Sequence, residues 1–255
     1  PSYRFDINEE CDLIEEISRV YGFDQIPENV EQQNMMLMNK SSRQLKRERI
    51  DSIFHQLGYN EVVNYSFVSP SMNSLSDSKA DMIDLQNPIS IEMSVMRNSL
   101  WPGLLNNLSH NIKRQHKDIK IFEVGKHFSS KKRRPIETNV IAGLIYGNRR
   151  LERWAYSKVT VDFYDLKGHL EDLFSVFNLE NVKFEPVSHP MLCPGVAAEI
   201  KLKNKKIGII GMLNPELSSD MKIEQDPFLF ELDYDCLELP ALTSFTSSEY
   251  YPSSR

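Results

Sequence analysis

Four carboxylates near the start of the chain have the residue type and spacing of a metal site. They are Asp6, Asp12, Glu15 and Glu16. Asp12 lies three and four residues before the two glutamates, so these side chains share one face of a helix, where like charges repel. The positive end of the helix dipole offsets part of this repulsion, and Mg²⁺, which prefers carboxylate oxygens, would offset more. A solvated acidic helix start is the alternative interpretation.

Two other charged features could contact a substrate or a partner. Glu123 stands alone in the apolar run 119–126 (IKIFEVGK) and is either a site carboxylate or a solvated one. The basic run 131–134 (KKRR) lies between two predicted strands, directly before Pro135. Its four cations have no interleaved aromatic residue to stack on a base. A solvated hairpin tip and a phosphate contact therefore both remain open.

The histidines and cysteines show no recognisable site pattern. The 6 histidines lack the spacing of a metal-binding motif, and neither a Gly-rich phosphate loop nor a nucleophile elbow occurs. Cys11, Cys193 and Cys236 lie far apart without a CxxC pair. This spacing favours a reducing compartment and argues against a disulfide framework or a zinc site.

Hydrophobic periodicity predicts the elements that position these residues. Helices are expected at 11–22, at 43–57, after Ser99 and at roughly 162–178. Asp12 is the expected N-cap of the first helix, and Gly22 is its expected stop. Strands are expected at 62–68, 118–128, 138–147, 196–203, 206–213 and 227–234. Because short turns join several strands, we predict an α+β fold, an antiparallel sheet with helices packed on it.

Composition and charge exclude several classes of protein. The chain has 255 residues, of which 40% are hydrophobic, and its formal net charge is −6. No run approaches the ~20 apolar residues of a membrane span, and no secretory signal opens the chain. Residues 1–30 carry eight acidic and two basic side chains, while the rest of the chain is balanced, which argues against a basic protein that coats nucleic acid. Since the first residue is Pro1, we expect a fragment or a processed product.

Ordered blocks of sequence extend over nearly the whole chain. They are 1–7 (PSYRFDI), 10–17 (ECDLIEEI), 19–27 (RVYGFDQIP), 96–105 (MRNSLWPGLL), 122–125 (FEVG), 162–171 (DFYDLKGHLE), 207–211 (IGIIG), 214–217 (NPEL) and 230–232 (FEL). Together these blocks closely resemble the bacterial phenylalanine–tRNA ligase (phenylalanyl-tRNA synthetase) β subunit family.

The resemblance implies how the chain is divided. Residues 1–30 are similar to the C-terminal part of the small B5-type domain, and residues 31–42 form a linker. Residues 43–240 are similar to the catalytic-like module of the family, a degenerate class II aminoacyl-tRNA synthetase fold with an antiparallel sheet and flanking helices. Residues 241–255 lead into an anticodon-binding domain that is then truncated.

The resemblance also implies a metal and partners. In the family, four carboxylates bind a Mg²⁺ that is shared with the α subunit, and by position they fall on Asp6, Asp12, Glu15 and Glu16. The family implies a cytoplasmic heterotetramer of two α and two β subunits that attaches phenylalanine to its tRNA with ATP. The helix at 43–57 and the strand after it resemble the first class II motif, and we expect them to form the main α-subunit contact.

The sequence departs from an active class II site at several positions. Such a site has an Arg two residues before the Glu of its second motif, where the guanidinium clamps the ATP α-phosphate. Here Ile121 takes that place before Glu123, and Tyr65 takes the place of the Pro expected seven residues after Gly58. No third motif is found around 161–168. The stretch 189–195 (HPMLCPG) also lacks the Arg that follows His-Pro-Gly in the family.

These departures predict a chain with no catalytic residue and no ATP site of its own. We expect it to contribute a scaffold, an α-subunit interface and Mg²⁺ ligands to the ligase. The alternative is a stand-alone binding or regulatory paralogue of a class II synthetase. Editing and anticodon domains encoded on either side would favour the subunit, whereas a natural start at residue 1 would favour the paralogue.

Overall fold

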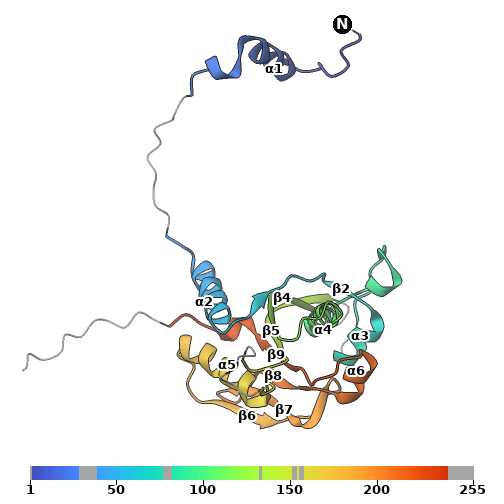
Figure 1. The fold of residues 1–255 in the computed structure, drawn as a ribbon, viewed down its shortest axis with the longest axis vertical. Helices are drawn as coiled ribbons and strands as arrows, with labels where there is room; N and C mark the ends of the chain where they lie inside the picture. The colour runs from blue at the N-terminus through green and yellow to red at the C-terminus, as the bar shows by residue number, and fades with distance from the viewer. Residues whose placement is uncertain are drawn as a thin grey trace, which may run out of the picture. The chain divides into compact units, whose positions relative to one another are not determined.

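A computed structural model describes residues 2–28, 39–76, 82–131, 134–150, 154 and 158–240. The chain forms two compact units, Pro1–Lys40 and Ser41–Arg255, which are treated separately below (Figure 1). In the described ranges, no helix has the length and apolar character needed to cross a membrane.

The first unit contains helix α1 (Glu10–Tyr21) and the short 3₁₀ helix η1 (Phe23–Gln25). The predicted stop is confirmed, because Gly22 ends α1 with φ 99°, a conformation that favours glycine. The predicted N-cap is wrong: Glu9 is the N-cap, and Asp12 stands three residues later. The carboxylate of Asp12 reaches back to accept the backbone N–H of Glu9 at 2.9 Å, which completes a capping box.

The second unit is built on a seven-stranded sheet with the order β1-β4-β5-β9-β8-β7-β6. Its strands are β1 (Asn60–Glu61), β4 (Ile119–Lys131), β5 (Arg134–Tyr146), β6 (Val182–Pro186), β7 (Leu192–Leu202), β8 (Lys205–Leu213) and β9 (Phe228–Asp233). Neighbouring strands are antiparallel except β1, which pairs with β4 in parallel. The predicted α+β architecture is therefore confirmed in outline, with one parallel pair at its edge.

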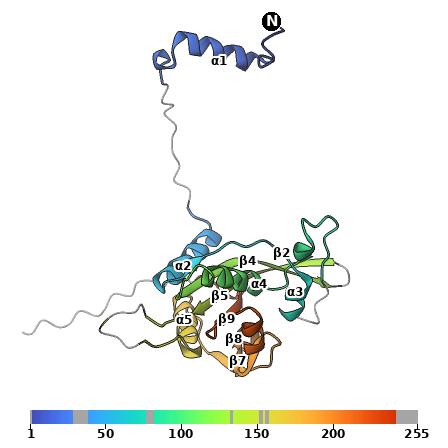
Figure 2. The same ribbon diagram turned by 45° about the vertical axis from the view of Figure 1, so that its right-hand side comes forward.

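Helices cover both faces of this sheet. The helices are α2 (Ser42–Gln56), α3 (Pro70–Ser76), α4 (Trp101–Ile112), α5 (Phe163–Val176) and α6 (Pro215–Asp220), with 3₁₀ turns η2 (Ile91–Met93) and η3 (Tyr234–Cys236). Helices α2 and α5 lie together on one face, called the rear face here, and α4 lies on the opposite or front face (Figures 1 and 2). A small ribbon of β2 (Phe67–Val68) and β3 (Val95–Met96) lies outside the main sheet.

The predicted strand at 62–68 is wrong in its middle. The structure has β1 before this segment and β2 at its end, and the residues between them leave the sheet. The cause is Asn64, whose side chain turns inward to hydrogen-bond Glu123, an interaction that a run of β-branched and aromatic residues does not reveal. Strand β6 and the short helices α3 and α6 were not predicted from the sequence.

Two apolar clusters on opposite sides of the sheet form the core. On the rear face, Phe54 of α2 stacks on Phe122 of β4, with ring centroids 4.7 Å apart, and on Phe230 of β9 at 5.7 Å. On the front face, Trp101, Leu104 and other side chains of α4 pack against β4, β5 and β9. The alternating side chains of the central strands thus fill both clusters, as expected for a sheet covered on both sides.

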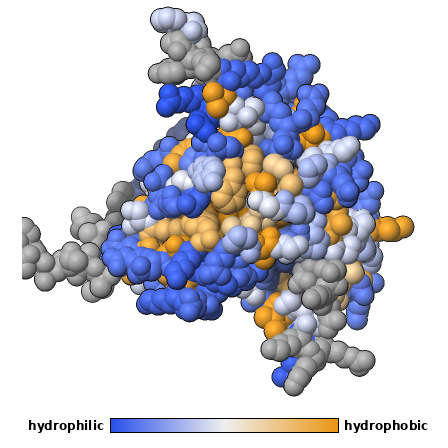
Figure 3. Space-filling model, turned by 90° about the horizontal axis from the view of Figure 1, so that it is seen from below, coloured by the Kyte–Doolittle hydropathy of each residue, from blue (hydrophilic) through white to orange (hydrophobic). Residues whose placement is uncertain are grey.

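The surface of the molecule is not uniformly polar. Seen from below, hydrophobic residues gather in the middle of the visible face, and hydrophilic residues surround them (Figure 3). Single exposed apolar residues are normal on a folded protein, but a gathered area of this kind is typical of surfaces that take part in interactions.

A partly buried histidine on the rear face makes the second unit sensitive to acid. His169 Nδ1 lies 2.9 Å from the Tyr59 hydroxyl, and burial, followed by the charge of Lys120, lowers the pKa of His169 from 6.5 to about 4. Because the unfolded chain binds this proton more readily, stability should fall as pH drops from 6.5 towards 4. We expect urea unfolding to show a loss of about 1–2 kcal/mol from pH 7 to pH 5, and a smaller loss in His169→Gln. An NMR titration of the His169 ring with a midpoint near 6.5 would contradict this assignment.

Candidate functional site

Two of the four predicted metal ligands, Asp6 and Glu16, are paired with arginines within the first unit. Arg4 bridges two of them, with its Nη2 at 2.8 Å from Asp6 Oδ2 and at 2.9 Å from Glu16 Oε1. Arg19 approaches Glu16 from the other side at 2.7 Å. These guanidinium contacts lower the pKa of both carboxyls, so they are ionised and paired at neutral pH. The sequence prediction missed the two arginines.

The other two predicted ligands have different surroundings. Asp12 accepts the backbone N–H groups of Glu9 and Asn8, which lowers the pKa of Asp12, and Glu15 is exposed. In the ranges that the structure describes, no three His, Cys, Asp or Glu side chains are gathered closely enough to hold a metal ion. The oxygen donors have the hard chemistry that Mg²⁺ requires, but their arrangement here serves the arginines and the helix cap.

Glu123 of β4 lies in the centre of a buried ion pair. Arg97 Nη1 is 2.7 Å from Glu123 Oε1, and the two side chains are only 5% and 3% exposed. Arg97 also donates from Nε to the carbonyl of Lys126 at 2.9 Å, and the Asn64 amide donates to Glu123 Oε2 at 2.7 Å. Glu123 is therefore not a solvated carboxylate: it is buried and accepts hydrogen bonds from Arg97 and Asn64.

The local sequence FEVG follows from this arrangement. Phe122 faces the rear cluster, whereas Glu123 faces front towards Arg97. A Cβ at Gly125 would lie 2.5 Å from Arg97 Nη2, so only glycine leaves room for the guanidinium. The pattern therefore serves the ion pair, and its spacing is set by the alternation of side chains along a strand.

A second carboxylate, Glu231, anchors residues 97–100, the segment that leads from β3 into α4. Glu231 Oε2 of β9 accepts the Ser99 hydroxyl and the backbone N–H of Leu100, both at 2.8 Å. The indole of Trp101 donates to the carbonyl of Phe230 at 3.0 Å. These contacts fix the start of α4 on the front face. Ser99 and Glu231 lie in the blocks 96–105 and 230–232, but their spacing alone predicted no role for either residue.

A buried isoleucine occupies the position at which an active class II site has an arginine. Ile121, two residues before Glu123, is 4% exposed and belongs to the same apolar cluster as Leu104 and Leu105 of α4. An isoleucine has no donor for a phosphate, and this one has no access to solvent. This position of β4 therefore has no guanidinium that could bind a phosphate.

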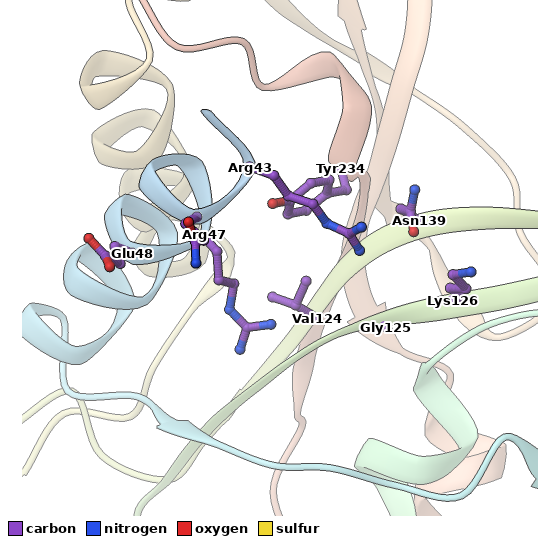
Figure 4. A pocket seen from close by; sticks show the side chains of 9 residues that line it. Arg43, Arg47, Glu48, Val124, Gly125, Lys126, Asn139 and Tyr234 are labelled. Atoms are coloured by element: carbon purple, nitrogen blue, oxygen red, sulfur yellow. The ribbon is translucent and has the colours of Figure 1, made fainter. Parts of the chain in front are cut away.

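Two concave regions flank the network. On the front face, a cleft of about 790 Å³ is lined by polar residues that include His127, Thr138 and His189, with Glu231 at its base. His127 Nδ1 lies 3.4 Å from Glu231 Oε1. On the rear face, a groove of about 550 Å³ lies between α2 and strands β4 and β5 (Figure 4).

The basic run 131–134 lies at the tip of the β4–β5 hairpin. Lys131 and Arg134 pair at the last rung of the ladder, as predicted for a hairpin tip, and residues 132–133 lie outside the described ranges.

The comparisons with known proteins agree with this geometry. A family description, "Phenylalanyl tRNA synthetase beta chain CLM domain", matches residues 26–234, and "tRNA synthetase B5 domain" matches residues 1–23. The solved structure of a pyrrolysyl tRNA synthetase from Desulfitobacterium hafniense has a TM-score of 0.56 and 15% identity, covering 77% of this chain and 67% of that chain. This likeness shows the fold alone, and that fold is of the class II synthetase type.

Relatives identify the family within this class. The chain is 37% identical over 256 residues to the phenylalanine–tRNA ligase beta subunit of Coxiella burnetii, and 38% identical over 255 residues to that of Methylococcus capsulatus. It belongs to the phenylalanyl-tRNA synthetase β chain family. Each alignment covers 100% of this chain and 32% of the relative, so the chain spans about a third of the length of these ligase subunits.

The buried ion pair should dominate the stability of the second unit. Arg97→Met leaves the Glu123 charge buried without a partner and should lower the free energy of unfolding by about 3–5 kcal/mol. Adding Glu123→Gln removes that charge but keeps an acceptor for Asn64, so the double variant should recover part of the loss. Urea denaturation of the wild-type chain and of the two variants measures both effects. A double variant no more stable than Arg97→Met alone would show that the charge itself is not the cause.

Proposed function

We propose that the chain is the central part of the β subunit of a phenylalanine–tRNA ligase, which with an α subunit attaches phenylalanine to its tRNA using ATP. Within that enzyme, the chain is a non-catalytic scaffold. The observation that carries this proposal is Ile121 packed beneath α4, together with Glu123 saturated by Arg97 and Asn64. Ile121 and Glu123, which stand at the Arg and Glu positions of the second class II motif, are thus both buried and occupied by structural contacts. Adenylate formation is therefore assigned to the α subunit.

The proposed organisation follows the family. Residues 1–30 complete a B5-type domain, 31–42 connect it to the catalytic-like module at 43–240, and 241–255 continue towards an anticodon-binding domain. The assembly is a heterotetramer of two α and two β subunits that binds tRNA in the cytoplasm. The unpaired thiols of Cys11, Cys193 and Cys236 suit such a reducing compartment.

The α-subunit interface is proposed to lie on α2 and the segment after β1. In that segment Asn64 points inward to Glu123, while its neighbours Val63 and Tyr65 point outward and are 88% and 68% exposed. A network that holds the backbone rigid while presenting two apolar side chains is a pre-organised contact surface. Leu45 of α2 adds a further exposed apolar group.

Substitution at this surface tests the proposal in the complete enzyme. In full-length β subunit co-expressed with α, Tyr65→Asp should reduce co-purification of α at least about tenfold, because it places a charge in a desolvated interface. Tyr164→Asp is the matched control, since Tyr164 is similarly exposed, at 74%, but lies on α5. Equal α recovery in both variants would place the interface elsewhere. Pyrophosphate exchange by the chain 1–255 alone, given phenylalanine and ATP, would contradict the non-catalytic role.

We also propose that Asp6, Asp12, Glu15 and Glu16 contribute to a Mg²⁺ site completed by the α subunit. Their oxygens fit the cation, and excess negative charge in residues 1–30 is tolerated where a cation compensates it. Since Arg4 holds Asp6 and Glu16 in the chain alone, metal binding requires that this bridge be exchanged for the cation.

Asp12→Asn tests the metal proposal without removing the helix cap, because asparagine accepts the same backbone hydrogen bonds. In the full α–β enzyme we expect the Mg²⁺ concentration that supports α association to rise severalfold, since one anionic ligand is lost. Asp24→Asn, an acidic residue of the same unit outside the set, should leave the Mg²⁺ titration unchanged. Superimposable titrations for the two variants would refute the assignment.

A further inference from the structure

Four polar side chains of the front cleft come from three neighbouring strands of the sheet. His127 of β4 stands opposite Thr138 of β5, and Val140 of β5 stands opposite Asp233 of β9. Glu231 lies two residues before Asp233 on β9, so alternation along the strand gives both the same face. All five residues line the cleft. Its volume of about 790 Å³ is typical of clefts that bind small molecules, roughly 300–1,000 Å³.

Glu231 is a largely buried carboxylate whose hydrogen bonds come from neutral groups. Its side chain is 14% exposed, and its Oε2 accepts the Ser99 hydroxyl and the backbone N–H of Leu100. Within the described residues no lysine or arginine pairs with it, in contrast to Glu123, which is paired with Arg97. Because a buried charge is normally compensated by an opposite charge, Oε1 is left to accept a further, positively charged donor.

An imidazole nitrogen beside this oxygen also lacks a hydrogen bond. His127 Nδ1 lies 3.4 Å from Glu231 Oε1, is buried, and has no hydrogen-bond partner in the described part of the chain. A neutral imidazole that carries its proton on Nε2 accepts at Nδ1. Two acceptors thus lie side by side without a donor, and buried polar atoms of this kind are normally satisfied. One donor group placed between them would satisfy both.

The other charged groups that line the cleft do not supply this donor. Lys206 Nζ lies 3.2 Å from Glu199 Oε1 and is paired there. Asp233 adds a second carboxylate, whose Oδ1 accepts the backbone N–H of Asp235. The second histidine of the cleft, His189, accepts a backbone N–H at its Nδ1. Two carboxylates thus stand against one lysine that is already paired, and this balance favours a cation over an anion.

We propose that the front cleft binds a small organic molecule through a primary ammonium group. The three N–H donors of an ammonium match Glu231 Oε1, His127 Nδ1 and the hydroxyl of Thr138, which stands opposite His127. Val140 and Ile209 line the same cleft, so an apolar body joined to the amine has a surface to pack on. This binding role is independent of the ligase assignment, since every group that carries it belongs to this chain.

Two probes of similar size that differ in charge test the ammonium. We expect calorimetric titration of the complete chain at neutral pH to show binding of phenethylamine. Phenethyl alcohol, in which a hydroxyl replaces the ammonium, should bind at least about tenfold more weakly, because charge-assisted hydrogen bonds are the stronger ones. His127→Phe removes one acceptor and should weaken binding of the amine severalfold. Equal affinity for the two probes, or no binding of the amine at millimolar concentrations, would overturn the proposal.

Substitution at the carboxylate separates its charge from its structural role. Glu231→Gln keeps an acceptor oxygen for Ser99 and Leu100 but removes the charge, so binding of the amine should fall at least about tenfold. Glu137→Gln, the same change on β5 outside the lining of the cleft, should leave binding unchanged. Urea unfolding of each variant shows whether the fold is kept; if Glu231→Gln does not fold, His127→Phe decides.

The protonation state of His127 provides a readout that a purely structural role would not move. Added phenethylamine should shift the NMR resonances of the His127 ring, and phenethyl alcohol should shift them less. A ring already protonated on both nitrogens in the free chain at neutral pH would overturn the proposal, because the imidazolium itself would then be the cation that pairs with Glu231.

Discussion

Two carboxylates on the sheet hold together the parts of the second unit that are far apart in sequence. Glu123 of β4 binds Arg97, and Glu231 of β9 accepts the Ser99 hydroxyl and the backbone N–H of Leu100, the N-cap of α4. Residues 97–100, which lead from β3 into α4, are therefore held by two strands of the sheet, and this positions the start of α4 on the front face. Because buried carboxylates are stable only with their partners in place, this constraint couples the packing of the helix to the geometry of the strands.

The same anchoring places a polar network inside a synthetase-like fold. A carboxylate that an active site would leave available is here satisfied by Arg97 and Asn64, and the neighbouring Ile121 has become core. Polar groups were retained as structural anchors, so the front face remains well ordered although it has no phosphate clamp.

Periodicity predicted α2, α4, α5 and most strands of the sheet, because each buries one face or alternates between two clusters. It failed where a single polar residue overrides the pattern, as at Asn64, and at the short edge strand β6. The ion pair between Arg97 and Glu123 could not be predicted, because the two residues are 26 positions apart and local spacing does not indicate such a contact. The candidate carboxylates were found by their excess charge, whereas Arg4, which pairs two of them, was not.

The edges of the seven-stranded sheet determine how other chains can approach it. At one edge β1 has only two residues, and at the other β6 alternates Lys183 and Glu185 and ends in Pro186, which has no backbone N–H to donate. Short edges, exposed charges and proline each oppose the addition of a further strand. Addition of a further strand at β1 or β6 is therefore disfavoured, which favours assembly through side-chain contacts on helices and loops, contacts that can be specific for one partner.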